Sequence, residues 1–265
     1  MFKDLALVVD AGTQEAGTYA VSLAKFIDAH LTMIPIELSP DAYASQEVSF
    51  AKWEERENLI AKIAENFQVE GLAQGLPINI LLLDERINNR IQALSGILRV
   101  FDLIILEQIS NERNPARRRI VMASVFRTGR PVLVVPCIQA KTAFIETTLI
   151  AWDGSMPAAR ALGDALPLLS RSAKVEIVQI ETRSHGECDG TMVQSHLARH
   201  GIHAELRRMP KSNDVGKTIL MYAADIDADL LIMGAYGHSR MSEEMFGGTT
   251  RTIMEYMTLA TFMSH

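Results

Sequence analysis

The feature that most constrains the fold of this chain is that its pattern of apolar runs and acidic residues occurs twice. The first apolar run, LALVV, is closed by Asp10, and the run that begins the later half is closed by Asp153. Asp102 and Asp229 each stand directly before the fourth apolar run of their half. Self-similarity on this scale indicates two copies of one structural unit.

The length of the chain agrees with that interpretation. Its 265 residues suffice for two domains of ordinary size. The second copy is the shorter one because its second helical stretch is shorter. We predict a first domain at 1–140 and a second at 141–265.

Short β-branched and leucine-rich runs alternate with stretches of helical spacing throughout both halves. Such alternation predicts parallel βαβ units, and strands this apolar require helices on both faces of the sheet. The fold class is therefore α/β, with two tandem doubly wound domains, each built on a five-stranded parallel sheet. The predicted strands are 5–9, 31–38, 77–83, 102–106 and 131–136, then 145–151, 175–180, 203–207, 230–233 and 259–263.

A glycine-rich stretch follows the fourth strand of the second half. The apolar run 230–233 stops at Gly234, and Gly237, Gly247 and Gly248 follow before a helical stretch that opens with Thr249. Glycine lets a ligand approach the backbone without a Cβ in the way. Free N–H groups at a helix start attract phosphate. The alternative is a pair of loops that merely need flexible turns.

Composition narrows the classes of function. A net charge of −6 argues against nucleic-acid binding, and no apolar run approaches the ~20 residues of a membrane span. Two cysteines are too few for a disulfide framework, and the N-terminal run passes into a turn without a signal-peptide pattern. We expect a cytoplasmic protein that associates with neither nucleic acid nor membrane.

The glycines match a known spacing. Gly234, two residues, Gly237, nine residues and Gly247 resemble the signature of the universal stress protein family, here in its tandem two-domain form. The acidic first turn of that family is matched by Asp153 with its following Gly-Ser pair. The resemblance implies the strand order 3-2-1-4-5 in each domain, with a ligand crevice between strands 1 and 4.

The resemblance also implies a ligand, ATP, with Mg²⁺ as a companion ion. The acid would meet ribose, adenine or the metal ion, the end of the second strand would face adenine, and the glycines would hold ribose and phosphates. The residues assigned in this way to nucleotide binding are Asp153, Gly154, Ser155, Ile180, Gly234, Gly237, Gly247, Gly248 and Thr249.

Two departures from the family pattern bear on that expectation. Gly248 stands where the family has a hydroxyl, with Thr249 one position later, and one lost hydrogen bond weakens binding by about 0.5–1.5 kcal/mol. In the first half Glu107 takes the place of Gly234, and residues 108–119 contain no glycine. A carboxylate repels phosphate, so the first half is predicted to be degenerate.

The functional hypothesis is a universal stress protein whose second domain binds an adenine nucleotide in a stress-linked regulatory role. No catalytic constellation is evident, so any ATP hydrolysis would be slow. The alternative is a nucleotide-free interaction module that keeps the fold as an internal dimer. We expect the halves to pair as a pseudo-dimer within the chain or to form a homodimer through their last strands. A cluster of histidines around His196 and His200 lacks paired cysteines, and we assign it no metal.

Overall fold

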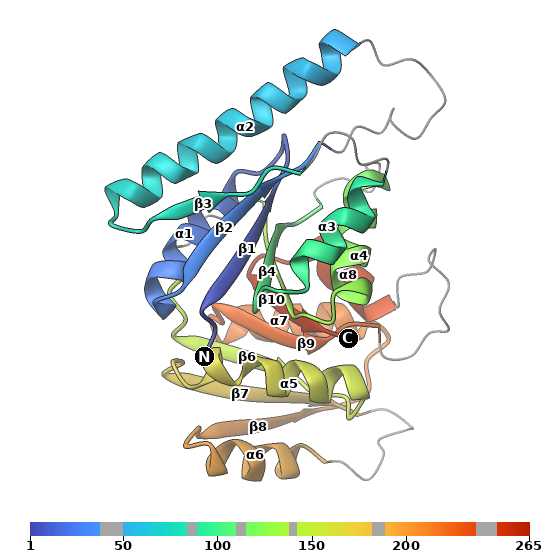
Figure 1. Cartoon of the computed structure of the whole chain (residues 1–265). Coiled ribbons are helices and arrows are strands. Elements are labelled where there is room, and N and C mark those ends of the chain that lie inside the picture. The colour runs from blue at the N-terminus through green and yellow to red at the C-terminus, as the bar shows by residue number, and fades with distance from the viewer. Residues whose placement is uncertain (38–49, 84–88, 110–114, 138–141, 182–188, 237–247) are drawn as a thin grey trace. The chain divides into compact units, whose positions relative to one another are not determined.

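Two compact units divide the chain, Met1–Ala143 and Phe144–His265. Figure 1 shows the computed structural model on which their description rests. The structure describes residues 1–37, 50–83, 89–109, 115–137, 142–181, 189–236 and 248–265.

The first unit is a five-stranded parallel sheet with the strand order β3-β2-β1-β4-β5. α1 packs on α2, and α3 packs on α4. Because the chain moves outward from β1 to β3 and then returns to β4, right-handed crossovers place these two helix pairs on opposite faces. The elements are β1 Asp4–Val9, α1 Glu15–Ile27, β2 His30–Pro35, α2 Phe50–Ala73, β3 Ile78–Ile80, α3 Arg90–Leu98, β4 Leu103–Glu107, α4 Pro115–Arg127 and β5 Val132–Val135.

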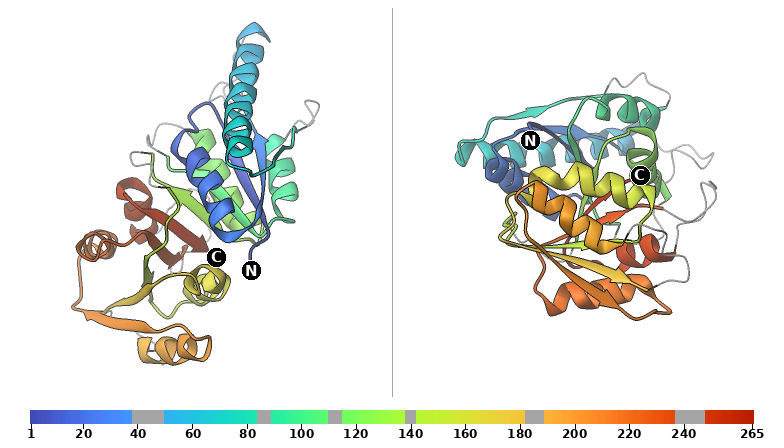
Figure 2. Two further views of the ribbon diagram at one scale, coloured as in Figure 1. Left: turned by 90° about the vertical axis from the view of Figure 1, so that its left-hand side faces the viewer. Right: turned by 90° about the horizontal axis from the view of Figure 1, so that it is seen from below.

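The second unit repeats this order as β8-β7-β6-β9-β10, again with parallel pairing throughout. The views in Figure 2 show α6 alongside β7 and β8, which it contacts. The predicted fold class and the strand order 3-2-1-4-5 are thus confirmed. The elements are β6 Thr147–Ala151, α5 Met156–Leu169, β7 Lys174–Ile180, α6 Gly190–Arg199, β8 Ala204–Met209, α7 Val215–Asp225, β9 Leu230–Gly234, α8 Gly248–Tyr256 and β10 Ala260–Ser264.

The repeated aspartates before the fourth strands do the same work in both units. Asp102 Oδ2 accepts hydrogen bonds from the N–H groups of Lys3 and Asp4, at 2.8 and 3.1 Å. Asp229 Oδ2 accepts from the two equivalent N–H groups of the second unit, at 3.1 and 3.0 Å. Each aspartate therefore satisfies backbone donors where the first strand of its unit begins, which explains why the sequence repeats it.

The core of each unit lies between its sheet and the helices that cover both faces of that sheet. Successive residues of a strand point to opposite faces, yet the adjacent pairs Leu5–Ala6 of β1 and Leu103–Ile104 of β4 are fully buried. Helices on both sides explain why these strands are apolar without interruption.

β3 is shorter than predicted. The sequence predicts a strand at 77–83, whereas β3 ends at Ile80 and the next two leucines are exposed. Gln68 of α2 donates its side-chain N–H to the carbonyl of Ile78 at 2.7 Å. This edge strand therefore has a side chain in place of a further strand as its partner.

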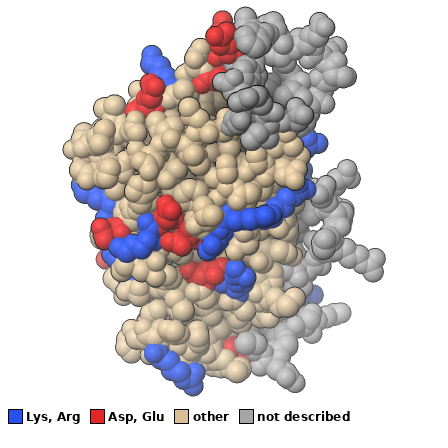
Figure 3. Space-filling view, viewed as in Figure 1, with Lys and Arg blue, Asp and Glu red and all other residues tan. Residues whose placement is uncertain are grey.

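Charged side chains of both signs are interspersed on the described part of the face shown in Figure 3. Lys3 and Asp28 form an ion pair of 2.8 Å, and both side chains are exposed. Exposed pairs of this kind contribute about 0–1 kcal/mol each to stability. No helix within the described ranges is long and apolar enough to cross a membrane.

Candidate functional site

The predicted site residues of the second unit that the structure describes lie at the carboxyl edge of its sheet. Ala151, the last residue of β6, pairs with Met233 of β9 on one side and with Val178 of β7 on the other. Asp153 follows β6 by two residues and Gly234 is the last residue of β9, so the two lie at neighbouring strand ends. This edge is where open α/β sheets bind ligands.

The turn after β6 is held by its own polar groups. Asp153 Oδ1 accepts the N–H of Ser155 at 2.9 Å, and Gly154 supplies the positive φ of 74° that the turn requires. Ser155 is the N-cap of α5, and its Oγ accepts the N–H of Ala158 at 3.2 Å. The Asp153 residue is exposed, so its carboxylate is accessible at the sheet edge.

Gly234 has a packing role that the sequence did not reveal. A Cβ added there would lie 2.4 Å from the backbone nitrogen of Ala158 and 2.7 Å from the carbonyl carbon of Pro157. The first turn of α5 therefore already occupies the side of Gly234 to which a Cβ would point. Only glycine at this position allows helix and strand to approach so closely.

Gly248 differs from Gly234. It is the first residue of α8, it is exposed, and a Cβ added there would meet nothing within 4 Å. Open space thus faces the start of this helix, with Thr249 beside it half-buried. Gly237 and Gly247 lie outside the described residues.

A contact missed by sequence reasoning joins β9 to α8. Thr250 is buried, and its Oγ1 accepts the N–H of Tyr236 at 3.3 Å. Tyr236 itself is buried and has a φ of 64°, a conformation that costs a non-glycine residue of order 1 kcal/mol. The only hint of this contact in the sequence is that a second hydroxyl residue, Thr250, directly follows Thr249. Its link to Tyr236 fixes where α8 begins relative to β9.

Ile180 is buried at the end of β7. The next residue, Glu181, donates its N–H to the carbonyl of Met209 at 2.9 Å. The ladder between β7 and β8 therefore continues to the sheet edge, and β8 extends beyond the predicted 203–207 for this reason.

Strand register identifies the equivalent positions of the first unit. Leu5 of β1 pairs with Leu103 of β4, just as Thr148 of β6 pairs with Leu230 of β9. Counting along the fourth strands from these pairs puts Glu107 in the position of Gly234, as the sequence comparison predicts.

Glu107 is buried, and its carboxylate reaches the start of α1. Its Oε2 accepts the N–H groups of Gln14 and Ala16 at 2.6 and 3.1 Å. Burial raises the pKa of Glu107 above its ordinary value, and the two N–H donors and the charge of Arg117 oppose that rise.

Arg117 of α4 forms a bidentate ion pair with Asp10, through Nε to Oδ2 and Nη2 to Oδ1. Both side chains are largely buried, with 15% and 12% of their surface exposed. Burial alone would lower the pKa of Arg117, but the hydrogen bonds and charge of Asp10 outweigh it, and the pKa is raised.

Little space is left around this ion pair. The cavity beside Asp10, Glu107 and Arg117 measures about 20 Å³, with apolar walls that include Val8 and Leu106. That volume is of the order of one water molecule. The crevice of the first unit is therefore filled by its own side chains.

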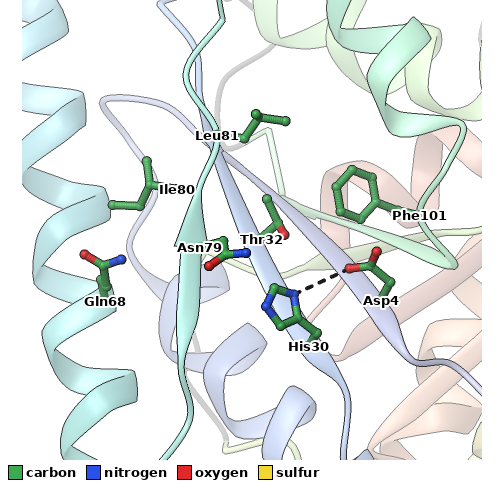
Figure 4. A pocket seen from close by; sticks show the side chains of 8 residues that line it. All are labelled: Asp4, His30, Thr32, Gln68, Asn79, Ile80, Leu81 and Phe101. Atoms are coloured by element: carbon green, nitrogen blue, oxygen red, sulfur yellow. Dashed lines mark ion pairs between the residues drawn. The ribbon is translucent and has the colours of Figure 1, made fainter.

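A larger hollow of about 530 Å³ lies elsewhere in the first unit, at the amino ends of β1 and β2 (Figure 4). Asp4 and His30, the first residues of these strands, face each other with 3.7 Å between Oδ1 and Nδ1. Thr32 and Asn79 continue the polar row across the sheet. This hollow is at the opposite end of the strands from Asp10 and is separate from the candidate site.

The whole chain is similar to solved structures. A universal stress protein from Archaeoglobus fulgidus is 13% identical and superposes with a TM-score of 0.70, covering 97% of both chains. The chain has the universal stress protein fold. The resemblance inferred from the glycine spacing is thus confirmed at the level of the fold.

Two solved structures of proteins from Pseudomonas aeruginosa are also similar to the whole chain. One protein named as a candidate universal stress protein and one of unknown function give TM-scores of 0.61 and 0.59. Each is 14% identical, and each match covers 98% of this chain and 92% of the other. No protein-family model and no curated protein sequence matches the chain.

Proposed function

We propose that this chain is a tandem universal stress protein whose second unit binds an adenine nucleotide, ATP with Mg²⁺, in a regulatory stress response in the cytoplasm. The match of the fold over nearly the whole of the chain supports the family assignment. The single observation that carries nucleotide binding is the contrast between the units. The second unit has open space beside Gly248, whereas the crevice of the first unit is filled by its own side chains.

The chemistry of this edge suits a nucleotide. N–H groups at the start of α8, from Gly248 onward, would hold phosphate oxygens, aided by the helix dipole. The exposed carboxylate of Asp153 would accept hydrogen bonds from ribose or bind Mg²⁺, which prefers oxygen ligands. α5 contributes less, because Pro157 has no N–H and the N–H of Ala158 is taken by Ser155.

Titration with a fluorescent ATP analogue in the presence of Mg²⁺ tests the proposal. Gly248→Glu should weaken binding by about tenfold or more, because it brings a carboxylate to the proposed phosphate site. Gly163→Glu is the matched control, since Gly163 also faces open space but lies within α5, away from the sheet edge. Absence of saturation at millimolar nucleotide would end the proposal.

One observation favours the alternative of a nucleotide-free interaction module. Packing against α5 is by itself a sufficient reason for glycine at position 234. Mass spectrometry of the supernatant after denaturing the purified protein discriminates between the two, because a tight binder carries nucleotide through purification. The pairing of the two halves, or of two chains, stays a prediction.

A further inference from the structure

In the first unit the start of α1 binds an anionic group that belongs to the chain itself, the carboxylate of Glu107. The carboxylate of Glu107 accepts hydrogen bonds from two N–H groups at the start of the helix, those of the N-cap residue Gln14 and of Ala16 in the first turn. The positive end of a helix dipole and its free N–H groups are the features that hold a phosphate or a carboxylate ligand. Glu107 thus makes internally the contacts that an anionic ligand would make.

Arg117 completes the closure. Its guanidinium is paired with Asp10 and lies over the turn that follows β1, where a Cβ added at Gly12 would be 2.9 Å from Nη2. The equivalent turn of the second unit carries the exposed Asp153. The turn that is exposed in the second unit is therefore covered by the side chain of Arg117 in the first unit.

We propose that Glu107 and Arg117 are an internal substitute for an anionic ligand, and that they close the first unit to phosphate-bearing molecules. Removal of the Glu107 carboxylate exposes a latent anion site made of the N–H groups of Gln14 and Ala16 with the cation of Arg117 beside them. This inference concerns the first unit and holds whether or not the second unit binds nucleotide.

The test follows the amide NMR signals of Gln14 and Ala16 in the full isotope-labelled chain during addition of inorganic pyrophosphate. In the wild type these two signals should stay unchanged up to about 10 mM pyrophosphate. In Glu107→Ala they should shift and saturate, with a dissociation constant at least about tenfold below any value measurable for the wild type. Signals of the second unit report separately on any site there.

Two further variants sharpen the result. Glu107→Gln fills the same space with a neutral amide and should respond as the wild type does. The double variant Glu107→Ala with Arg117→Met should lose the gained affinity by about tenfold or more. Should Glu107→Ala fail to give a dispersed spectrum, Glu107→Ser provides the same measurement with a smaller change in polarity.

Two outcomes would overturn the proposal. Saturable shifts of Gln14 and Ala16 in the wild type would mean that the first unit is open to anions. A folded Glu107→Ala or Glu107→Ser chain in which neither signal responds would mean that Glu107 is only a structural cap of α1.

Discussion

Replacement of Arg117 by methionine tests how the first unit is held together. The substitution keeps much of the side-chain volume and removes the charge that faces two buried carboxylates, those of Asp10 and Glu107. Breaking a buried ion pair by removing one partner costs about 3–5 kcal/mol. Asp10 would still accept hydrogen bonds from the N–H of Gly12 at 2.8 Å and the hydroxyl of Thr13 at 3.3 Å. We therefore expect the lower end of that range, about 3 kcal/mol.

Urea unfolding followed by tryptophan fluorescence measures this loss in the right unit. The two tryptophans are Trp53 in the first unit and Trp152 in the second, so a Trp152→Phe background reports on the first unit alone. With a slope of about 2 kcal/mol per M urea, the midpoint should fall by about 1.5 M. Arg119→Met, exposed on the same helix, is the control and should change stability by less than about 0.5 kcal/mol.

The triple variant Asp10→Asn, Glu107→Gln, Arg117→Met provides the decisive comparison. Removal of all three charges leaves no uncompensated carboxylate, so it should recover at least about 1 kcal/mol relative to Arg117→Met. A loss below about 1 kcal/mol for Arg117→Met, or a triple variant less stable than the single one, would refute the reasoning.

Three further predictions follow from the structure. Because the pKa of Glu107 is raised in the folded state, protonation of this side chain favours folding. The unfolding free energy of the wild type, measured relative to that of Glu107→Gln, should therefore increase as the pH falls toward 4.5. This increase should be absent at higher pH, where Glu107 is ionised in both states. Gly234→Ala should destabilise the second unit by about 1–3 kcal/mol in urea unfolding, because its Cβ would overlap α5, whereas Gly163→Ala should be neutral or stabilising. Burial and the hydrogen bond to Glu176 raise the pKa of Tyr222 to about 12, so this tyrosine should ionise near pH 12 in an ultraviolet titration. The stability that it confers should be present below pH 10 and lost toward pH 12.

Each of these has an outcome that contradicts it. A difference between wild type and Glu107→Gln that does not vary with pH would show that Glu107 titrates alike in both states. Equal midpoints for Gly234→Ala and wild type would show that α5 can shift without cost. The Tyr222→Phe variant should not lose stability between pH 10 and pH 12. If it does, a group other than Tyr222 is responsible for that loss.

Much of the fold was predictable because the same pattern of apolar runs and acidic residues occurs in both halves of the chain. Apolar runs closed by Asp10 and Asp153 predict buried parallel strands, and the shared register of β1 with β4 and of β6 with β9 confirms that the copies are equivalent. The ends of β3 and β8 were predicted wrongly. An apolar run does not show where the partner strand stops, and pairing decides the length of a strand.

The candidate site was predictable only in part. Sequence comparison found that Glu107 replaces Gly234, because the two align in the repeat. The roles of Thr250 and Tyr236 escaped it, because a hydroxyl next to another hydroxyl gives no sign of which one is buried.

The sequence by itself determined that this chain is a doubled parallel α/β protein and that only its second half carries the spaced glycines Gly234, Gly237 and Gly247. Those properties follow from local periodicity and from the residue types at turns. Only the tertiary structure decided that Glu107 binds the start of α1, that Arg117 pairs with Asp10 across 107 positions, and that α5 fills the space beside Gly234. Such contacts join elements far apart in the chain, so burial and side-chain direction exist only after the sheet has brought its strands together.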